Sequence, residues 1–237
     1  MRQLPLPLHH VEPPSLENFI AGGNAECVAL LRRIRAGTRE PRFVYLWGPA
    51  GSGRSHLLAS LSPPGELVRA ALQADALIHA PPGALFLIDD CDALEPAAEQ
   101  ALFALYNRVQ ASEAGLTLIA TGSQPPRFTD VREDLRSRFG WGLVFRLQLL
   151  SDEDKARALV AHAARRGVEL APDVIPWLLT HQDRDIRHLL ELLDAFDRYA
   201  FEQRRALTLA LLREFAACGA MDNATAQRDD SDGAPPA

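Results

Sequence analysis

The chain has 237 residues, of which 47% are hydrophobic and 24% charged, and its formal net charge is −6. This composition is ordinary for a globular protein that is large enough to bury a core. No apolar run reaches the length of a membrane span, and the first residues lack the apolar core of a signal peptide, so we expect a cytoplasmic protein without a membrane partner. The three cysteines are far apart and predict neither a disulfide framework nor a zinc site.

The first 14 residues are rich in proline and predict an extended arm ahead of the first domain. Within the arm, leucine alternates with proline after a glutamine, in the run Gln3, Leu4, Pro5, Leu6, Pro7 and Leu8. Prolines keep such a peptide extended at low ordering cost, so its leucines can enter apolar pockets of a partner protein while the glutamine hydrogen-bonds at the rim. The alternative is an arm that packs on its own domain.

Helix and strand signals alternate from the end of the arm to about residue 150. A helix begins near Asn24, the expected N-cap, and apolar runs typical of strands follow at 43–47, 66–70, 84–89, 116–121 and 143–147. Strands that alternate with helices form a parallel sheet that is covered on both faces. We therefore predict a three-layer α/β domain over residues 15–150.

A glycine-rich loop directly follows the first of these apolar runs. It fits the phosphate-binding pattern G-x-x-x-x-G-K-[ST] except that Arg54 replaces the lysine. The glycines let backbone N–H groups face a phosphate, the dipole of the helix that begins there favours the same anion, and Ser55 can bind Mg²⁺. We expect a nucleotide to contact Gly48, Pro49, Ala50, Gly51, Ser52, Gly53, Arg54, Ser55 and His56.

Two further features belong to this predicted site. Asp89 and Asp90 end the third apolar run, at the edge of the sheet where the phosphate loop also lies, so we expect Asp89 to share Mg²⁺ with Ser55 and Asp90 to position an attacking water. The hydroxyl of Thr121 can sense the γ-phosphate, although a plain polar exit from the strand is the alternative. Because arginine is longer and forked where lysine is a point charge, Arg54 predicts phosphate binding with slow turnover.

Helix signals continue without strands over residues 151–218. A capping box opens the first helix at Ser151, Gly167 ends it, and three more helices follow. We predict a small all-helical lid domain. The last segment, 219–237, is small, polar and acidic, and predicts a disordered tail.

Together the phosphate loop, the Asp-Asp strand, the segment L-R-S-R-F at 135–139 and the helical lid resemble the DnaA clade of the AAA+ ATPases. The resemblance implies that the chain binds ADP or ATP. In that clade an arginine of the S-R-F segment reaches a nucleotide held by a neighbouring chain, and the matching residue is Arg138, with Arg136 as the second candidate. A lid arginine that senses the chain's own nucleotide matches Arg187, with Arg184 as its rival. Both roles require a fork of fixed positive charge.

The arm adds a closer likeness, because it resembles the clamp-binding peptide at the start of the Hda-like family of DnaA-related regulators. That resemblance implies an ADP- and Mg²⁺-binding protein that docks on the sliding clamp, the beta subunit of DNA polymerase III. It also implies that the protein stimulates hydrolysis of DnaA-bound ATP and thereby inhibits re-initiation of replication. DnaA continues past its lid into a helix-turn-helix domain, whereas this sequence ends at Ala237 and is acidic, so direct DNA binding is not expected. A homo-oligomer stays open.

Three other functions stay open at this point. A self-hydrolysing AAA+ ATPase such as a helicase loader would show turnover by the isolated protein and would bind helicase instead of clamp. A P-loop nucleotide kinase would need a substrate-side arginine cluster, and we find no convincing one in the sequence. A DNA-binding initiator fragment would bind duplex DNA with a steep salt dependence.

Overall fold

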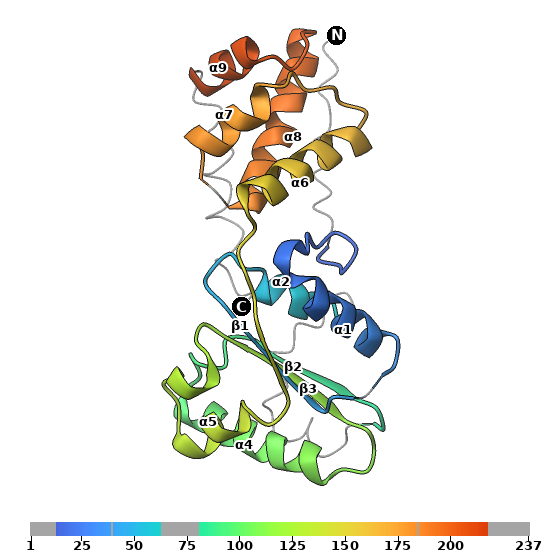
Figure 1. Ribbon diagram of the computed structural model, residues 1–237, viewed down its shortest axis with the longest axis vertical. Helices are drawn as coiled ribbons and strands as arrows, with labels where there is room; N and C mark the ends of the chain where they lie inside the picture. Colours follow the sequence, from blue (N-terminus) through green and yellow to red (C-terminus); the bar gives the residue numbers. More distant parts are fainter. Residues whose placement is uncertain (1–12, 39, 63–80, 184, 218–237) are drawn as a thin grey trace, which may run out of the picture. The chain divides into compact units, whose positions relative to one another are not determined.

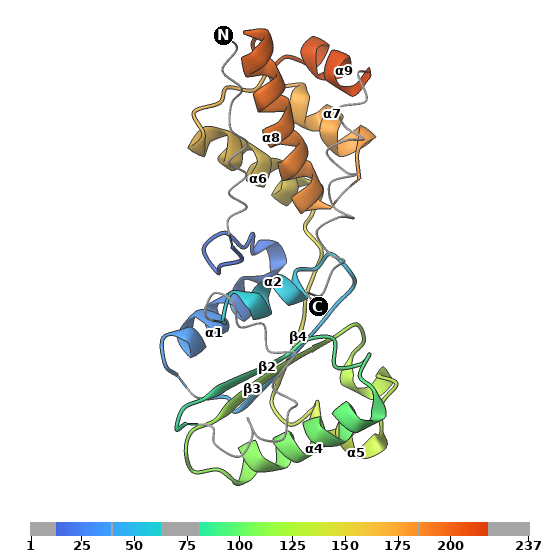
Figure 2. The same cartoon turned by 180° about the vertical axis from the view of Figure 1, so that it is seen from behind.

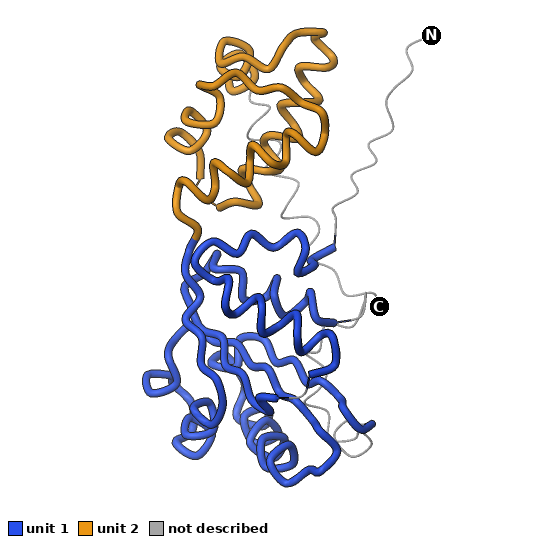
Figure 3. Tube along the Cα trace, turned by 45° about the vertical axis from the view of Figure 1, so that its right-hand side comes forward, with its two compact units in different colours: residues 1–149 blue, residues 150–237 orange. Residues whose placement is uncertain are grey.

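The computed structural model describes residues 13–38, 40–62, 81–183 and 185–217 (Figure 1). Residues 1–12 of the predicted clamp-binding arm and the acidic tail lie outside these ranges. The chain divides into two compact units, residues 1–149 and 150–237, which Figure 3 colours separately. We describe each unit by itself.

The first unit contains a parallel sheet whose described strands have the order β2-β3-β1-β4. The strands are β1 (Phe43–Trp47), β2 (Leu85–Ile88), β3 (Thr117–Gly122) and β4 (Leu143–Arg146). Each lies within one residue of the run predicted from the sequence. The predicted run at 66–70 falls outside the described residues.

Helices cover both faces of this sheet. They are α1 (Ala25–Arg35), α2 (Arg54–Ala59), α4 (Pro96–Ala111) and α5 (Glu133–Arg138), with short 3₁₀ turns at Gly22–Asn24 and Pro126–Phe128. Phe43 and Tyr45 of β1 pack in the cluster formed by α4 and α5. Val44 and Leu46 pack in the cluster formed by α1 and α2, so alternate residues of one strand serve opposite faces. Figures 1 and 2 show the two helical layers, and the predicted three-layer fold is confirmed.

Asn24 precedes α1 as predicted, but its side chain does not cap the helix. Its amide instead donates to the Gln148 carbonyl at 2.9 Å and accepts from the Gln148 N–H at 2.8 Å. This reciprocal pair ties the start of α1 to the chain just beyond β4. The predicted N-cap position is confirmed, but the Asn24 side chain bonds to the distant Gln148 backbone and not to the start of the helix.

The second unit is helical, with α6 (Asp152–Arg165), α7 (Val174–His181), α8 (Ile186–Gln203) and α9 (Leu209–Ala217). The predicted capping box is confirmed: the Ser151 hydroxyl accepts from the Asp154 N–H at 3.1 Å, and the Asp154 carboxylate accepts from the Ser151 N–H at 3.3 Å. The Ser151 hydroxyl also donates to the Asp154 carboxylate at 2.8 Å, and this hydrogen bond is the main cause of the lowered pKa of Asp154.

The end of α6 also follows its prediction. Gly167 has φ +69°, and the N–H groups of Gly167 and Val168 bond to the carbonyls of Ala164 and Ala163 in a Schellman ending. The helices enclose one apolar core that includes Leu159, Leu178, Leu192, Phe196 and Leu212. Within the described ranges, no helix combines the length and the apolar character needed to cross a membrane.

Candidate nucleotide-binding site

The phosphate loop follows β1 and adopts the backbone that its glycines predict. Gly51 has φ +78° and Gly53 has φ +89°, a region where a Cβ atom is strained. Packing adds a second constraint, because a Cβ on Gly53 would lie 2.5 Å from the ring of Phe19. Backbone N–H groups in such a loop form a concave anion-binding nest. The helix α2 has only six residues, so its dipole contributes less to the predicted phosphate site than this nest of backbone N–H groups does.

The side chains of the loop complete this arrangement. Ser55 is exposed at the first turn of α2, where its hydroxyl is accessible to a metal ion. Ser52 is buried, and its Oγ has no hydrogen-bond partner among the described residues. Nη1 of Arg54 is also buried and has no hydrogen-bond partner among the residues that the structure describes. Buried polar groups in folded proteins are nearly always hydrogen-bonded, so two such donors on one loop fit the oxygens of a bound phosphate.

The two acids that follow β2 are held in place by β3. The Thr121 hydroxyl donates to Asp89 Oδ1 at 2.5 Å and accepts from the Asp90 N–H at 3.0 Å. The Thr121 carbonyl accepts from the Cys91 N–H at 2.8 Å. Thr121 is fully buried, and its hydroxyl positions the two acids. The expected role of Thr121 as a sensor of the γ-phosphate stays a prediction.

Asp90 also connects the acids to the phosphate loop. Arg54 Nη2 lies 3.4 Å from Asp90 Oδ1. The backbone of Asp90 has φ +45°, which is uncommon for a residue other than glycine and brings the carboxylate out of the strand direction. The structure therefore brings together the loop and the Asp-Asp pair, although β3 separates their strands in the sheet.

A segment ahead of α1 packs against the helix of the phosphate loop. His56 Nε2 lies 3.1 Å from the Ser15 carbonyl oxygen, and the rings of His56 and Phe19 are 5.4 Å apart between centroids. His56, predicted to contact a nucleotide, thus faces this N-terminal segment. The sequence reasoning missed Phe19, whose only signal is its place before a glycine-rich turn and the first helix.

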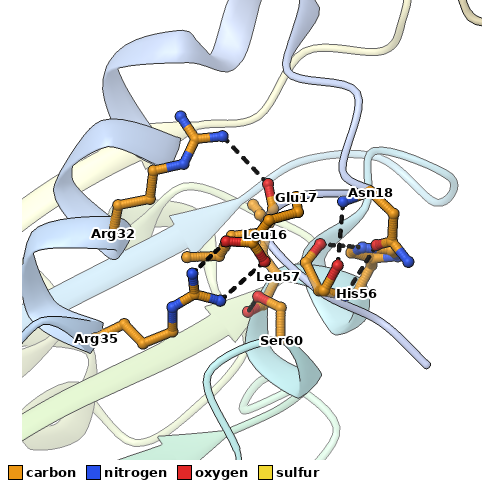
Figure 4. Close-up of polar contacts among 9 residues, drawn as sticks. Leu16, Glu17, Asn18, Arg32, Arg35, His56, Leu57 and Ser60 are labelled. Atoms are coloured by element: carbon orange, nitrogen blue, oxygen red, sulfur yellow. Dashed lines mark hydrogen bonds and ion pairs between the residues drawn. The ribbon is translucent and has the colours of Figure 1, made fainter. Parts of the chain in front are cut away.

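Two arginines of α1 hold the same segment from the other side (Figure 4). Arg32 donates to the Leu16 carbonyl at 3.3 Å, and Arg35 forms a two-point ion pair with the carboxylate of Glu17. The hydrogen bond from Arg35 lowers the pKa of Glu17. The segment is therefore attached to both helices on this face of the sheet.

Arg138 lies at the end of α5, apart from its own phosphate loop. Its guanidinium carbon is 3.8 Å from the ring centroid of Trp141 and 5.0 Å from that of Phe103. Trp141 contacts the ring of Phe43 edge-on, with 5.8 Å between centroids. Phe43 is the first residue of β1, whereas the phosphate loop follows the last, about 13 Å further along the strand. Arg138 therefore belongs to the opposite edge of the sheet.

Arg187 belongs to the second unit, in the first turn of α8, and its side chain is 64% exposed. Asp185 caps this helix by accepting hydrogen bonds from the N–H groups of Arg187 and His188. The sensor role of Arg187 stays a prediction. Its rival Arg184 and the arm residues from Gln3 to Leu8 lie outside the part of the chain that the structure describes.

Comparison with known proteins places these features in a family context. Residues 152–215 match the family model described as the lid domain of Hda. The chain is similar to domain III of the Thermotoga maritima replication initiation protein DnaA, with 19% identity, a TM-score of 0.65, and coverage of 85% of this chain and 96% of that one.

Two further solved structures share the fold. AMPPCP-bound DnaA from Aquifex aeolicus has 19% identity and a TM-score of 0.64, covering 81% of this chain and 68% of that one. A variant of Thermotoga maritima RuvB has 19% identity and a TM-score of 0.64, covering 88% and 73%. The chain thus has a segment that matches the Hda lid and shares the fold of DnaA domain III.

Proposed function

We propose that this chain is a nucleotide-binding regulator that docks on the sliding clamp of DNA polymerase III and supplies Arg138 to ATP held by DnaA. The observation that carries the proposal is the match to the Hda lid in a chain with the fold of DnaA domain III. The expected effect is inhibition of re-initiation of replication. The clamp contact is assigned to Gln3, Leu4, Leu6, Pro7 and Leu8.

In this proposal ADP or ATP binds at the phosphate loop. The buried Nη1 of Arg54 and Oγ of Ser52, which have no hydrogen-bond partner within the described ranges, support phosphate binding there, because each can donate to a phosphate oxygen. Ser55 and Asp89 would hold the Mg²⁺ ion, which neutralises phosphate charge when bound. The AMPPCP bound by the Aquifex aeolicus DnaA supports the same class of ligand.

The geometry also supports slow hydrolysis by the chain itself. The ion pair with Arg54 draws the Asp90 carboxylate toward the loop cation, which opposes its use as a base for an attacking water. Arg138 is on the opposite edge of the sheet from this loop and suits a nucleotide that belongs to another chain. An arginine supplied in trans stabilises the negative charge of the transition state.

The test measures hydrolysis of DnaA-bound ATP in the presence of DNA-loaded clamp. We expect Arg138→Ala to keep the fold, ADP binding and clamp binding, and to lower the stimulation by about a hundredfold or more. Arg138→Lys recovers little, since a point charge does not reproduce a forked contact. Full stimulation by Arg138→Ala contradicts the proposal for this residue, and Arg136 is then the one to test.

The clamp contact has its own test. The double variant Leu6→Ala, Leu8→Ala should lose clamp binding while ADP binding is unchanged, because the arm precedes the nucleotide-binding unit. Clamp binding at wild-type affinity rejects the arm as the docking segment. Binding to helicase together with rapid ATP hydrolysis by the isolated chain would favour a helicase-loader-like ATPase instead.

A further inference from the structure

Among the residues that the structure describes, no acidic side chain forms an ion pair with the guanidinium of Arg138. Its Nε atom is buried and has no hydrogen-bond partner among the described residues. Arg132, in the turn before α5, differs in that it pairs with Asp134 at 2.7 Å. A partly dehydrated cation without an anion is costly unless another interaction compensates it.

Two aromatic rings supply that compensation. Trp141 follows α5 and lies 3.8 Å from the guanidinium carbon, and Phe103 of α4 lies 5.0 Å from it. The electron-rich face of an aromatic ring attracts a guanidinium at these distances, most strongly for tryptophan. Such stacking uses the flat face of the guanidinium and leaves the N–H groups at its edge to bind an oxyanion.

The position of Trp141 is itself well determined. The backbone N–H of Trp141 donates to the Arg138 carbonyl at 3.0 Å, and the Trp141 ring contacts the ring of Phe43 in β1. The next residue, Gly142, passes so close to β1 that a Cβ would lie 1.9 Å from the Phe43 carbonyl oxygen. Backbone and ring contacts thus fix the tryptophan against the sheet, although 41% of it stays exposed.

We propose that Trp141 and Phe103 are positioning residues, which hold the Arg138 guanidinium in place for a phosphate group presented by another chain. The inference rests on the proposed function of Arg138. It adds the two aromatic side chains that hold the Arg138 guanidinium in one orientation. A long arginine side chain loses rotational freedom when it binds an anion, and contact with two rings removes part of that cost in advance.

The experiment compares four variants of the full chain in the assay of DnaA-bound ATP hydrolysis. Trp141→Leu and Phe103→Leu remove the stacking surface, whereas Trp141→Phe keeps an aromatic face. Phe128→Leu is the matched control, because Arg127 lies 4.6 Å over the Phe128 ring in the same unit without contact to Arg138. Each variant is titrated, so that maximal stimulation and half-saturating concentration are obtained separately.

We expect Trp141→Leu to lower maximal stimulation about tenfold at an unchanged half-saturating concentration, and Phe103→Leu to lower it less, since tryptophan is the stronger partner. The maximal stimulation by Trp141→Phe should stay within about threefold of wild type. Phe128→Leu should stimulate as strongly as the wild type. Should Trp141→Leu fail to bind ADP or to fold, Phe103→Leu and Trp141→Phe decide the question.

Two results overturn the inference. Stimulation at the wild-type level by Trp141→Leu and Phe103→Leu, with Arg138→Ala inactive, removes the positioning role and leaves the proposed function intact. Equal losses in Trp141→Phe and Trp141→Leu indicate a packing role without dependence on the aromatic face. Normal stimulation by Arg138→Ala, by contrast, rejects the proposed function of the arginine itself.

Discussion

The guanidinium of Arg54 lies 3.4 Å from the carboxylate of Asp90, and this pair joins the phosphate loop to the acids that follow β2. The two side chains are 14% and 41% exposed, so solvent screens the pair in part and its effect on the free energy of unfolding is modest. We expect a larger consequence for ligand binding, because a phosphate bound at the loop would compete with this carboxylate for one forked cation.

The first prediction concerns this competition. Asp90→Asn should tighten ADP binding by about three- to tenfold, because it releases Arg54 to the phosphate and removes a negative charge from the site. Isothermal titration calorimetry measures the Kd. Asp92→Asn is the control, since the Asp92 carboxylate accepts from the N–H and hydroxyl of Ser123 and not from the loop. Unchanged or weaker ADP binding by Asp90→Asn contradicts the competition.

The second prediction concerns turnover. The isolated chain should bind ADP at least as tightly as ATP and should hydrolyse ATP more slowly than about one molecule per minute, far below the usual enzyme range. Phosphate release from a nucleotide-free preparation measures the rate. Arg54→Ala serves as the control for site-specific binding and should lose most nucleotide affinity. Several turnovers per minute that disappear in Arg54→Ala would show an active ATPase.

The third prediction isolates the hydroxyl that orders the two acids. Thr121→Val should lower the free energy of unfolding by about 1–3 kcal/mol, because Asp89 Oδ1 loses the donated hydroxyl and the Asp90 N–H loses one of its two acceptors, Asp89 Oδ1 being the other. Thr121→Ser keeps the hydroxyl and should be closer to wild type. Thr117→Val is a matched control on the same strand, since the buried Thr117 hydroxyl has no hydrogen-bond partner among the described residues. Equal effects of the two valine variants in urea unfolding would reject this role for Thr121.

The fourth prediction concerns pH and the N-terminal segment. Hydrogen bonding to Arg35 lowers the pKa of Glu17 from its ordinary value of 4.5. The folded pKa is therefore below the unfolded one, so the stabilising contribution is present above about pH 4.5 and is lost as pH falls through the folded value. NMR of the Arg35 guanidinium between pH 6 and 3 should report this release. Identical titrations of wild type and Glu17→Gln would show that Glu17 does not hold the segment.

Local patterns were sufficient for most elements of the fold. The apolar run at β1 and the glycines of the phosphate loop specify backbone conformations through nearest neighbours, and the capping box at Ser151 closes within one helical turn. Such signals need no information about distant residues. The position of Asn24 as the N-cap of α1 follows from such a local signal, whereas the bond of its side chain to Gln148 does not.

The sequence by itself determined the residue types of the candidate site: a phosphate loop with arginine, an Asp-Asp strand end and an S-R-F segment. Only the tertiary structure decided how these groups are used. It pairs Arg54 with Asp90, turns the Thr121 hydroxyl toward Asp89, and places Arg138 against two aromatic rings. The physical reason is that hydrogen bonds and ring contacts depend on distances of a few ångströms between residues far apart in the chain, which are set by sheet order and helix packing and leave no periodic trace in the sequence.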